Sequence, residues 1–135
     1  MIVKKVRAII YDIKDNEPYF LILHRILRWS GWEILKETME PGEKIEETLL
    51  RGINEETGLK NFEIIKNLDK TEKWQVDGID YEIIATFLIK ADMNEEISLK
   101  QEIIEHDGYE WANKETVISK LTYLETKELI KQLTI

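Results

Sequence analysis

The stretch from Trp32 to Leu59 reads WEILKETMEPGEKIEETLLRGINEETGL, and the rest of the chain is organised around it. From Lys36 onward it carries seven carboxylates against three cationic side chains, those of Lys36, Lys44 and Arg51. Negative charge at this density repels itself unless cations lie among it. The seven carboxylates belong to Glu37, Glu40, Glu43, Glu46, Glu47, Glu55 and Glu56.

The second half of this stretch has the pattern of an amphipathic helix. Ile45, Leu49 and Ile53 recur at helical spacing with Leu50 beside them, and Gly58 stands where a left-handed C-terminal cap is usual. We expect these apolar residues to pack inward. The opposite face should then present Arg51, Gly52, Glu55 and Glu56.

Adjacent carboxylates at Glu55 and Glu56 suit a hard cation such as Mg²⁺. The segment resembles the Nudix box of the Nudix hydrolases, whose pattern is Gly, five residues, Glu, seven residues, then Arg-Glu-aliphatic-any-Glu-Glu-any-Gly-aliphatic. Aligned on Arg51, the sequence departs from this pattern at two positions, with Glu37 in place of the first Gly and Gly52 in place of the Glu after Arg. The matching residues are Glu43, Arg51, Ile53, Glu55, Glu56, Gly58 and Leu59.

The resemblance implies an α/β fold, a Nudix-type α/β/α sandwich around a mixed sheet, formed by residues 1–135 as a single domain. A charged amphipathic helix with a merely solvated acidic face is the alternative interpretation. Such a helix does not need Pro41, Gly42 and Glu43 directly before it and Gly58 directly after it at the spacing of the family.

The two departures from the box suggest an exchange between neighbouring positions. In one hypothesis, the Glu37 carboxylate projects into the space that Gly52 leaves empty and so serves catalysis. In the other, Glu37 points to solvent and the site is impaired. Glycine inside a helix costs ~1 kcal/mol relative to alanine, which suggests that something needs the room at position 52.

Length and composition indicate a water-soluble globular protein. A chain of 135 residues with 43% hydrophobic and 34% charged residues can bury one sizeable core. It contains no apolar run approaching the ~18 residues of a membrane span, and no signal peptide pattern, so we expect it in the cytoplasm. The absence of cysteine excludes disulfides and thiol nucleophiles.

The formal net charge of -8 argues against binding to duplex nucleic acid, because such proteins gather Lys and Arg against phosphates. An acidic protein can still bind a polyphosphate when divalent metals bridge the two sets of anions. The sequence leaves the oligomeric state open.

Alternating strand and helix patterns predict a mixed α/β arrangement with helices on both faces of a sheet. A turn at residues 15–18 should join the first two strands, and Asp77-Gly78 should join the segment 61–74 to the strand that follows. The expected strands are Val3–Ile13, Tyr19–His24, Trp32–Lys36 and Tyr81–Ile89, and the expected closing helices are Lys114–Ser119 and Leu124–Leu133.

A second constellation follows near the C-terminus, where residues 105–111 read EHDGYEW. With Tyr123 and a closing helix, it is similar to the C-terminal part of the diadenosine tetraphosphate hydrolase subgroup. The resemblance implies that Glu105 binds metal or deprotonates water and that Tyr123 lies near a base pocket. From the residues alone, Glu102 is nearly as good a candidate as Glu105. We expect His106 to be hydrogen-bonded in a structural role.

The leading functional hypothesis is a pyrophosphohydrolase that uses Mg²⁺, with Mn²⁺ as an alternative ion, on nucleotides such as dinucleoside polyphosphates. Glu55, Glu56 and Glu105 would bind metal, Arg51 would orient the carboxylates, and Lys36 would neutralise phosphate. A Nudix-fold module that binds a nucleotide without cleaving it is the main alternative, because Gly52 removes a carboxylate. A purely structural interaction protein is a further one.

Overall fold

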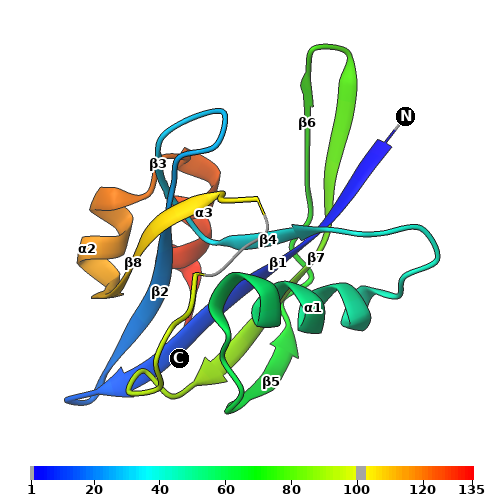
Figure 1. Cartoon of the computed structure of the whole chain (residues 1–135). Coiled ribbons are helices and arrows are strands. Elements are labelled where there is room, and N and C mark those ends of the chain that lie inside the picture. The colour runs from blue at the N-terminus through cyan, green and yellow to red at the C-terminus, as the bar shows by residue number, and fades with distance from the viewer. Residues whose placement is uncertain (1, 100–102) are drawn as a thin grey trace.

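The computed structural model describes residues 2–99 and 103–135 as one mixed sheet with helices on both faces (Figure 1). This confirms the predicted mixed α/β fold. The elements are β1 (Ile2–Lys14), β2 (Glu17–Arg25), β3 (Gly31–Glu33), β4 (Leu35–Thr38), α1 (Ile45–Thr57), β5 (Phe62–Asn67), β6 (Glu72–Val76), β7 (Ile79–Ala91), β8 (His106–Asn113), α2 (Lys114–Lys120) and α3 (Leu124–Gln132).

β1 is the central strand of the sheet. It runs parallel to β7 along one edge, and its other edge is shared by β4, opposite Lys5–Ala8, and β2, opposite Tyr11–Lys14. Both of these pairings are antiparallel, so the sheet diverges between β4 and β2. The strand order is β3-β2-β1-β7-β5, with β8 added on β2 and β6 on β7.

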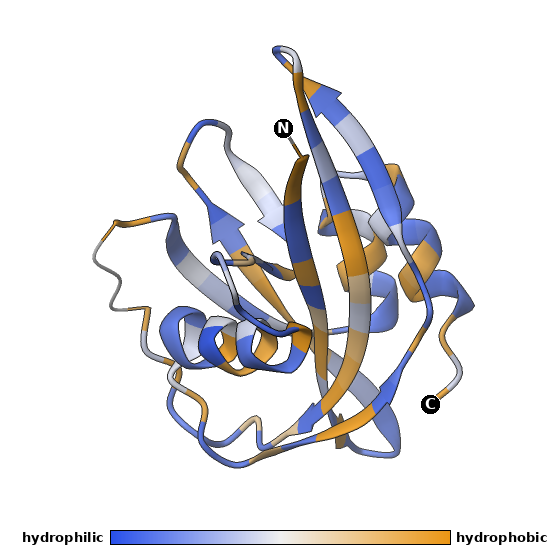
Figure 2. Cartoon of the chain, turned by 90° about the vertical axis from the view of Figure 1, so that its right-hand side faces the viewer, coloured by the Kyte–Doolittle hydropathy of each residue, from blue (hydrophilic) through white to orange (hydrophobic). Residues whose placement is uncertain are grey.

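Alternation along the strands divides the interior into two apolar clusters, one on each face. In β1, Ala8 and Ile10 point toward α1, whereas Ile9 and Tyr11 point toward α2 and α3. Figure 2 shows hydrophobic residues concentrated along the central strands and polar residues on the side of α1 that faces away from the sheet. Burying each large aliphatic side chain contributes about 1.5–3 kcal/mol, so the two faces together hold the sheet in place.

The hairpin at Asp77-Gly78 is confirmed, with Val76 paired to Ile79. The segment 61–74 is not one strand, however. Its first part, β5, pairs with the end of β7, and its last part begins β6, which pairs with the start of β7. β7 is 13 residues long, so one edge can take two short partners in succession.

The buried face of α1 differs from the predicted one. Ile45 and Leu50 are exposed, whereas Gly52 and Glu56 are buried. Residues three and four apart share a helix face, so Leu50, next to Leu49 in sequence, turns about 100° away from it. The buried residues of the helix are Thr48, Leu49, Gly52, Ile53, Glu56 and Thr57.

Among the described residues, no helix has both the length and the apolar character required to cross a membrane.

Candidate active site

Arg51 on α1 is the centre of a network of carboxylates. Its guanidinium donates to both oxygens of Glu43, with Nε to Oε2 at 2.8 Å and Nη2 to Oε1 at 2.9 Å. Nη1 lies 3.2 Å from Oε1 of Glu37 and 3.3 Å from Oε2 of Glu55, and Nη2 donates to the Thr38 carbonyl at 2.7 Å. Arg51 thus joins β4, the loop before the helix, and the helix itself. We call Arg51, Glu37, Glu43 and Glu55 the Arg51 network.

Within the Arg51 network, the hydrogen bonds between Arg51 and Glu43 favour the charged form of each. The hydrogen bonds from Arg51, together with those from the Glu40 amide and the Thr48 hydroxyl, lower the pKa of Glu43 to about 2. The same contact with Glu43 raises the pKa of Arg51 above its usual value. The two-point pairing therefore persists across the pH range in which enzymes ordinarily work.

Glu37 lies between Arg51 and the other carboxylates of α1. Burial raises its pKa, and although Arg51 opposes this, the neighbouring charges of Glu56 and Glu55 add to it. Its Cβ and Cγ lie directly over Gly52, where an added Cβ would come within 2.8 Å of the Glu37 Cβ. Glu37 therefore points toward the helix and not to solvent.

A second cation, His106 at the start of β8, bridges two buried carboxylates. Its Nε2 is 2.7 Å from Oε2 of Glu33, and its Nδ1 is 3.0 Å from Oε2 of Glu56. The end of β2 lies between β3 and β8, which brings Glu33 and His106 to its two sides. All three side chains are buried. We call Glu33, His106 and Glu56 the His106 chain, and the expectation that His106 is hydrogen-bonded is confirmed.

The His106 chain holds a charged imidazole. Burial by itself would lower the pKa of His106, but the hydrogen bonds to Glu33 and Glu56 outweigh it and raise the pKa to about 9. Burial likewise favours the neutral form of Glu33, yet the bond from His106 and the charges of Lys36 and Arg25 keep its pKa low. At neutral pH both ring nitrogens therefore donate to carboxylates, which fixes the position of Glu56.

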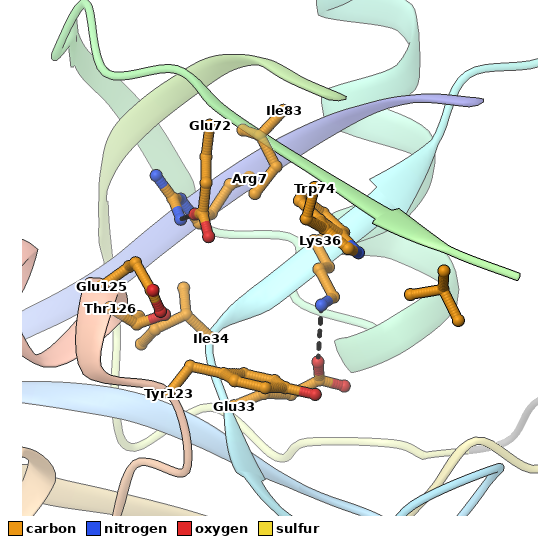
Figure 3. A pocket seen from close by; sticks show the side chains of 11 residues that line it. Arg7, Glu33, Ile34, Lys36, Glu72, Trp74, Ile83, Tyr123, Glu125 and Thr126 are labelled. Atoms are coloured by element: carbon orange, nitrogen blue, oxygen red, sulfur yellow. Dashed lines mark hydrogen bonds and ion pairs between the residues drawn. The ribbon is translucent and has the colours of Figure 1, made fainter. Parts of the chain in front are cut away.

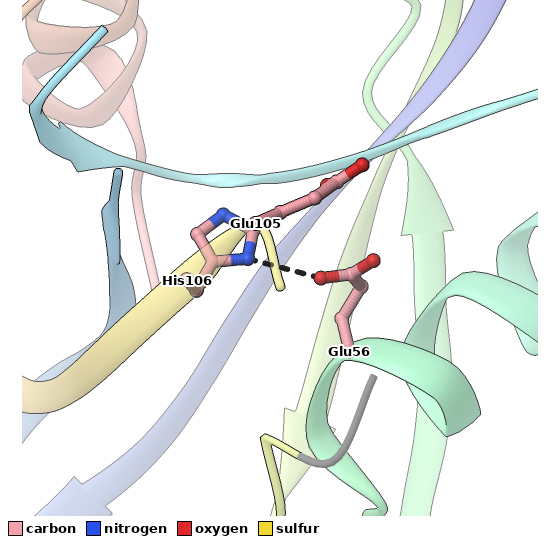
Figure 4. A group of neighbouring side chains, drawn as sticks. All are labelled: Glu56, Glu105 and His106. Carbon is pink, nitrogen blue, oxygen red and sulfur yellow. Dashed lines mark hydrogen bonds and ion pairs between the residues drawn. The ribbon is translucent and has the colours of Figure 1, made fainter. Parts of the chain in front are cut away.

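One group of side chains has the spacing of a metal site. Ligand atoms of Glu56, Glu105 and His106 all lie within 4.8 Å of one another, and Figure 4 shows the two carboxylates beside the His106 ring. Because both nitrogens of His106 face carboxylates, the donors for a hard cation are the oxygens of Glu56 and Glu105. This donor chemistry fits Mg²⁺ or Mn²⁺.

The structure brings some predicted site residues together and separates others. Glu56 and Glu105 approach each other, whereas the Glu55 side chain is 51% exposed and pairs with Arg51. Glu55 is therefore at the rim of the site and Glu56 in its interior. The alternative candidate, Glu102, lies outside the described residues.

A cleft of about 320 Å³ reaches the His106 chain at Glu33, which lines it (Figure 3). Lys36 extends into it, with its ammonium 5.4 Å from the centre of the Trp74 ring and 5.7 Å from that of Tyr123. Lys36 also lies 3.6 Å from Oε1 of Glu33, an oxygen that is buried without a hydrogen bond among the described residues. Glu33 thus belongs both to the cleft and to the His106 chain.

The inner end of the cleft is polar. Buried Arg7 donates to the Thr86 hydroxyl at 3.1 Å and to Oε2 of Glu72 at 2.9 Å. The Thr86 hydroxyl in turn donates to the Lys70 carbonyl at 2.9 Å, so its proton is already engaged in a hydrogen bond within the protein. The aromatic surfaces of the cleft come from Trp74 and Tyr123.

Sequence reasoning missed Glu33 as a site residue, and it considered Trp74 as a base-stacking residue without selecting it. Glu33 could have been recognised from the sequence, because an acidic residue between Trp32 and Ile34 in a short buried strand must have a partner inside the protein. The stacked pair Trp74 and Tyr81, at 5.5 Å between ring centres, fixes the wall of the cleft but had no distinguishing sequence pattern.

Comparisons with known proteins agree with this geometry. A family model described as NUDIX domain matches residues 1–133. The chain is 27% identical over 132 residues to an RNA pyrophosphohydrolase of Sulfurovum sp. (strain NBC37-1), covering 90% of this chain and 84% of that protein.

Solved structures share the fold. An Ap4A hydrolase from C. elegans, in a binary complex, superposes with a TM-score of 0.83 at 22% identity, covering 96% of this chain and 93% of that one. The NUDIX domain of Shewanella oneidensis NrtR, complexed with ADP ribose, has a TM-score of 0.68 at 16% identity, covering 98% and 86%. With the family model matched over almost its whole length, the chain belongs to the Nudix hydrolase family.

Proposed function

We propose that this protein is a Mg²⁺-dependent pyrophosphohydrolase of nucleotide-linked compounds, with dinucleoside polyphosphates as its main substrates. The observation that carries the proposal is the continuity of the site. A cleft with two aromatic surfaces is lined by Glu33 and Lys36, and His106 connects Glu33 to Glu56 in the group that has the spacing of a metal site.

The cleft is suited to one nucleoside end of the substrate. Its volume of about 320 Å³ accommodates a nucleobase with its ribose, and Trp74 and Tyr123 offer rings for stacking. Lys36 lies against both rings and 3.6 Å from Glu33, so its ammonium can neutralise the first phosphates of the bound nucleotide. This is the role proposed for Lys36 and Tyr123 in substrate binding.

The carboxylates are suited to hold the metal that would act on the phosphoanhydride bond of the substrate. A bound Mg²⁺ or Mn²⁺ would activate a water molecule and offset charge on the phosphate oxygens. Glu56 and Glu105, together with Glu55 at the rim, form the proposed ligand set. Glu55 and Glu105 are also the proposed groups that accept the proton of the attacking water, while Arg51 orients the network and His106 orients Glu56.

The direct test is a product assay. The purified protein is incubated with diadenosine tetraphosphate, ADP-ribose, nucleoside triphosphates and a short RNA with a 5′-triphosphate, in Mg²⁺, Mn²⁺ or EDTA. We expect cleavage of the dinucleoside polyphosphate only with metal. Preferred cleavage of the RNA would instead point to the chemistry for which the Sulfurovum relative is named.

A matched pair of variants places the activity in this site. Glu56→Gln keeps the size of the side chain but removes a proposed metal ligand, so we expect turnover to fall at least about 100-fold. Glu46→Gln, on the exposed side of α1, removes the same charge and should leave turnover unchanged. Equal turnover of Glu56→Gln and the parent would exclude Glu56 from the reaction.

A binding module that does not cleave is the second candidate, favoured by the glycine at position 52. It is distinguished by titrating a nonhydrolysable dinucleoside polyphosphate with and without EDTA. The hydrolase proposal expects affinity to fall sharply on chelation, because metals bridge the polyphosphate to the acidic site. Equal affinity without turnover would favour the binding module. In either role a nucleotide ligand is consistent with our proposal of a cytoplasmic protein.

A further inference from the structure

We propose that Glu37 is a positioning carboxylate of the metal site and stands in, from β4, for the side chain that Gly52 lacks on α1. Positions 37 and 52 would then form one functional unit whose two members have been exchanged. The inference rests on the proposed metal-dependent function and adds to it a specific residue and its partner.

The backbone does not require glycine at position 52. Gly52 lies in the middle of α1 and is absent from the glycines with positive φ, which are Gly31, Gly42, Gly58 and Gly78. Alanine at such a position would stabilise a helix by about 1 kcal/mol relative to glycine. The reason for glycine must therefore be a neighbour that needs the space.

That neighbour is Glu37. A Cβ at position 52 would lie 2.8 Å from the Glu37 Cβ and 3.2 Å from its Cγ, both closer than carbon atoms can approach without displacement. The Glu37 Cβ is anchored to β4, which pairs with Val6 of β1 at this residue. The strand cannot shift cheaply, so a side chain at 52 and the present Glu37 exclude each other.

The Glu37 carboxylate occupies the vacated space. Its Oε1 accepts from the Thr38 amide at 3.1 Å and pairs with Arg51 at 3.2 Å, and its Oε2 lies 3.6 Å from the point where a Gly52 Cβ would be. Only 15% of the side chain is exposed. The acid therefore lies on the inner face of α1, the face that also presents Glu56.

The charge balance around Glu37 indicates what it contributes. Arg51 already pairs at two points with Glu43 and also with Glu55 and Glu40, so together with Glu37 one guanidinium serves four carboxylates. Surplus buried negative charge is costly unless a cation joins it. Glu37 is not in the group with ligand spacing, and its Oε1 is already held by Arg51 and the Thr38 amide, so its proposed role is to add charge and hold Arg51.

The test separates metal affinity from folding. Mn²⁺ binding to the nucleotide-free protein is measured by electron paramagnetic resonance, and stability by thermal unfolding in EDTA. Glu37→Gln fills the same volume and still accepts from Thr38, so we expect unchanged stability but Mn²⁺ affinity about 10- to 100-fold weaker. Glu40→Gln is the matched control, because it also removes a carboxylate near Arg51, at 3.8 Å, but one that is 66% exposed. It should bind Mn²⁺ like the parent.

The exchanged variants test the coupling. Gly52→Glu alone should unfold at a lower temperature because it collides with Glu37. The double variant Glu37→Gly with Gly52→Glu should regain both the melting temperature and the Mn²⁺ affinity to within a few-fold of the parent. Recovered stability without recovered Mn²⁺ affinity would mean that the pair is merely a packing arrangement and would overturn the inference.

The remaining outcomes separate this inference from the proposed function. If the parent binds Mn²⁺ and hydrolyses its substrate but Glu37→Gln binds Mn²⁺ equally well, the inference alone is wrong. If the parent neither binds Mn²⁺ nor turns over any nucleotide, the proposed function is wrong and the role of Glu37 in a metal site is wrong with it.

Discussion

The Arg51 network and the His106 chain both use one cation to align carboxylates. They differ in how far apart in the sequence their residues lie and in whether the cation can lose its charge. The Arg51 network joins residues 37–55, which are close in sequence, and lies partly exposed. The His106 chain joins three segments, at positions 33, 56 and 106, and is buried. Arginine stays charged at all relevant pH values, whereas histidine can lose its proton. One arrangement is local and permanent, and the other depends on the whole fold and on pH.

The largest effect should come from removing the buried cation. His106→Ala leaves Glu33 and Glu56 buried without their shared donor, so we expect the free energy of unfolding at pH 7 to fall by about 3–5 kcal/mol. Urea denaturation in EDTA measures it. His24→Ala is the control, since His24 pairs with Asp107 at the surface and its loss should cost no more than about 1 kcal/mol. Equal losses in the two variants would show that burial of the chain contributes nothing.

The pH dependence of stability should follow His106. Its pKa is raised from 6.5 to about 9 in the folded protein, so its contribution is complete below pH 6.5 and is lost as pH rises through 9. In EDTA, the parent should therefore lose stability between pH 6.5 and 9, by an amount on the order of 3 kcal/mol. In His106→Gln the decline should be largely absent. A parent protein equally stable at pH 6 and pH 9 contradicts the charged state of the imidazole.

An intermediate effect is expected from a single methyl group at position 52. Gly52→Ala should destabilise the parent by about 1–3 kcal/mol through overpacking against Glu37, despite the better helix propensity of alanine. In the Glu37→Gly background the same change should stabilise by about 1 kcal/mol. Thermal unfolding of the four proteins measures this reversal of sign. The same sign in both backgrounds would rule out the steric coupling.

The smallest effect is expected from Glu43→Gln on the pH dependence of the free energy of unfolding. The pKa of Glu43 is lowered from 4.5 to about 2, so its contribution is complete above pH 4.5 and is lost as pH falls from 4.5 through 2. Glu43→Gln should therefore lose stability by the same amount at pH 6.5 and pH 9, leaving the slope of the parent unchanged. A changed slope would mean that the two cation centres are coupled electrostatically.

The same contrast explains how much the sequence could predict. The α1 helix, its Gly58 cap and the mixed sheet followed from local patterns, and the cap is observed in the left-handed conformation with φ of 71°. The prediction that Leu50 packs inward was wrong, because the spacing of neighbouring apolar residues does not determine which of them faces the sheet. The burial of Glu56 was missed for the same reason.

The His106 chain was beyond local patterns. Whether Glu33 meets His106 depends on the registers of β3 and β8 with β2, where Leu23 pairs with Glu33 and Arg25 with His106. A shift of one residue in either register would turn the side chain to the other face of the sheet. Register across segments far apart in the chain is set by the assembled core and cannot be read from spacing.

The parallel pairing of β1 with β7 also affects how the chain is made. Ile2 pairs with Asp80, so β1 must await residues synthesised 78 positions later, about 4–16 s at cellular elongation rates of roughly 5–20 residues per second. During this interval the edge of β1 that later pairs with β7 has unpaired backbone groups, and β1 also carries apolar side chains such as Val6, Ile9 and Ile10 on its two faces. We therefore expect chaperones to contact β1 during synthesis until β7 has emerged and paired with it.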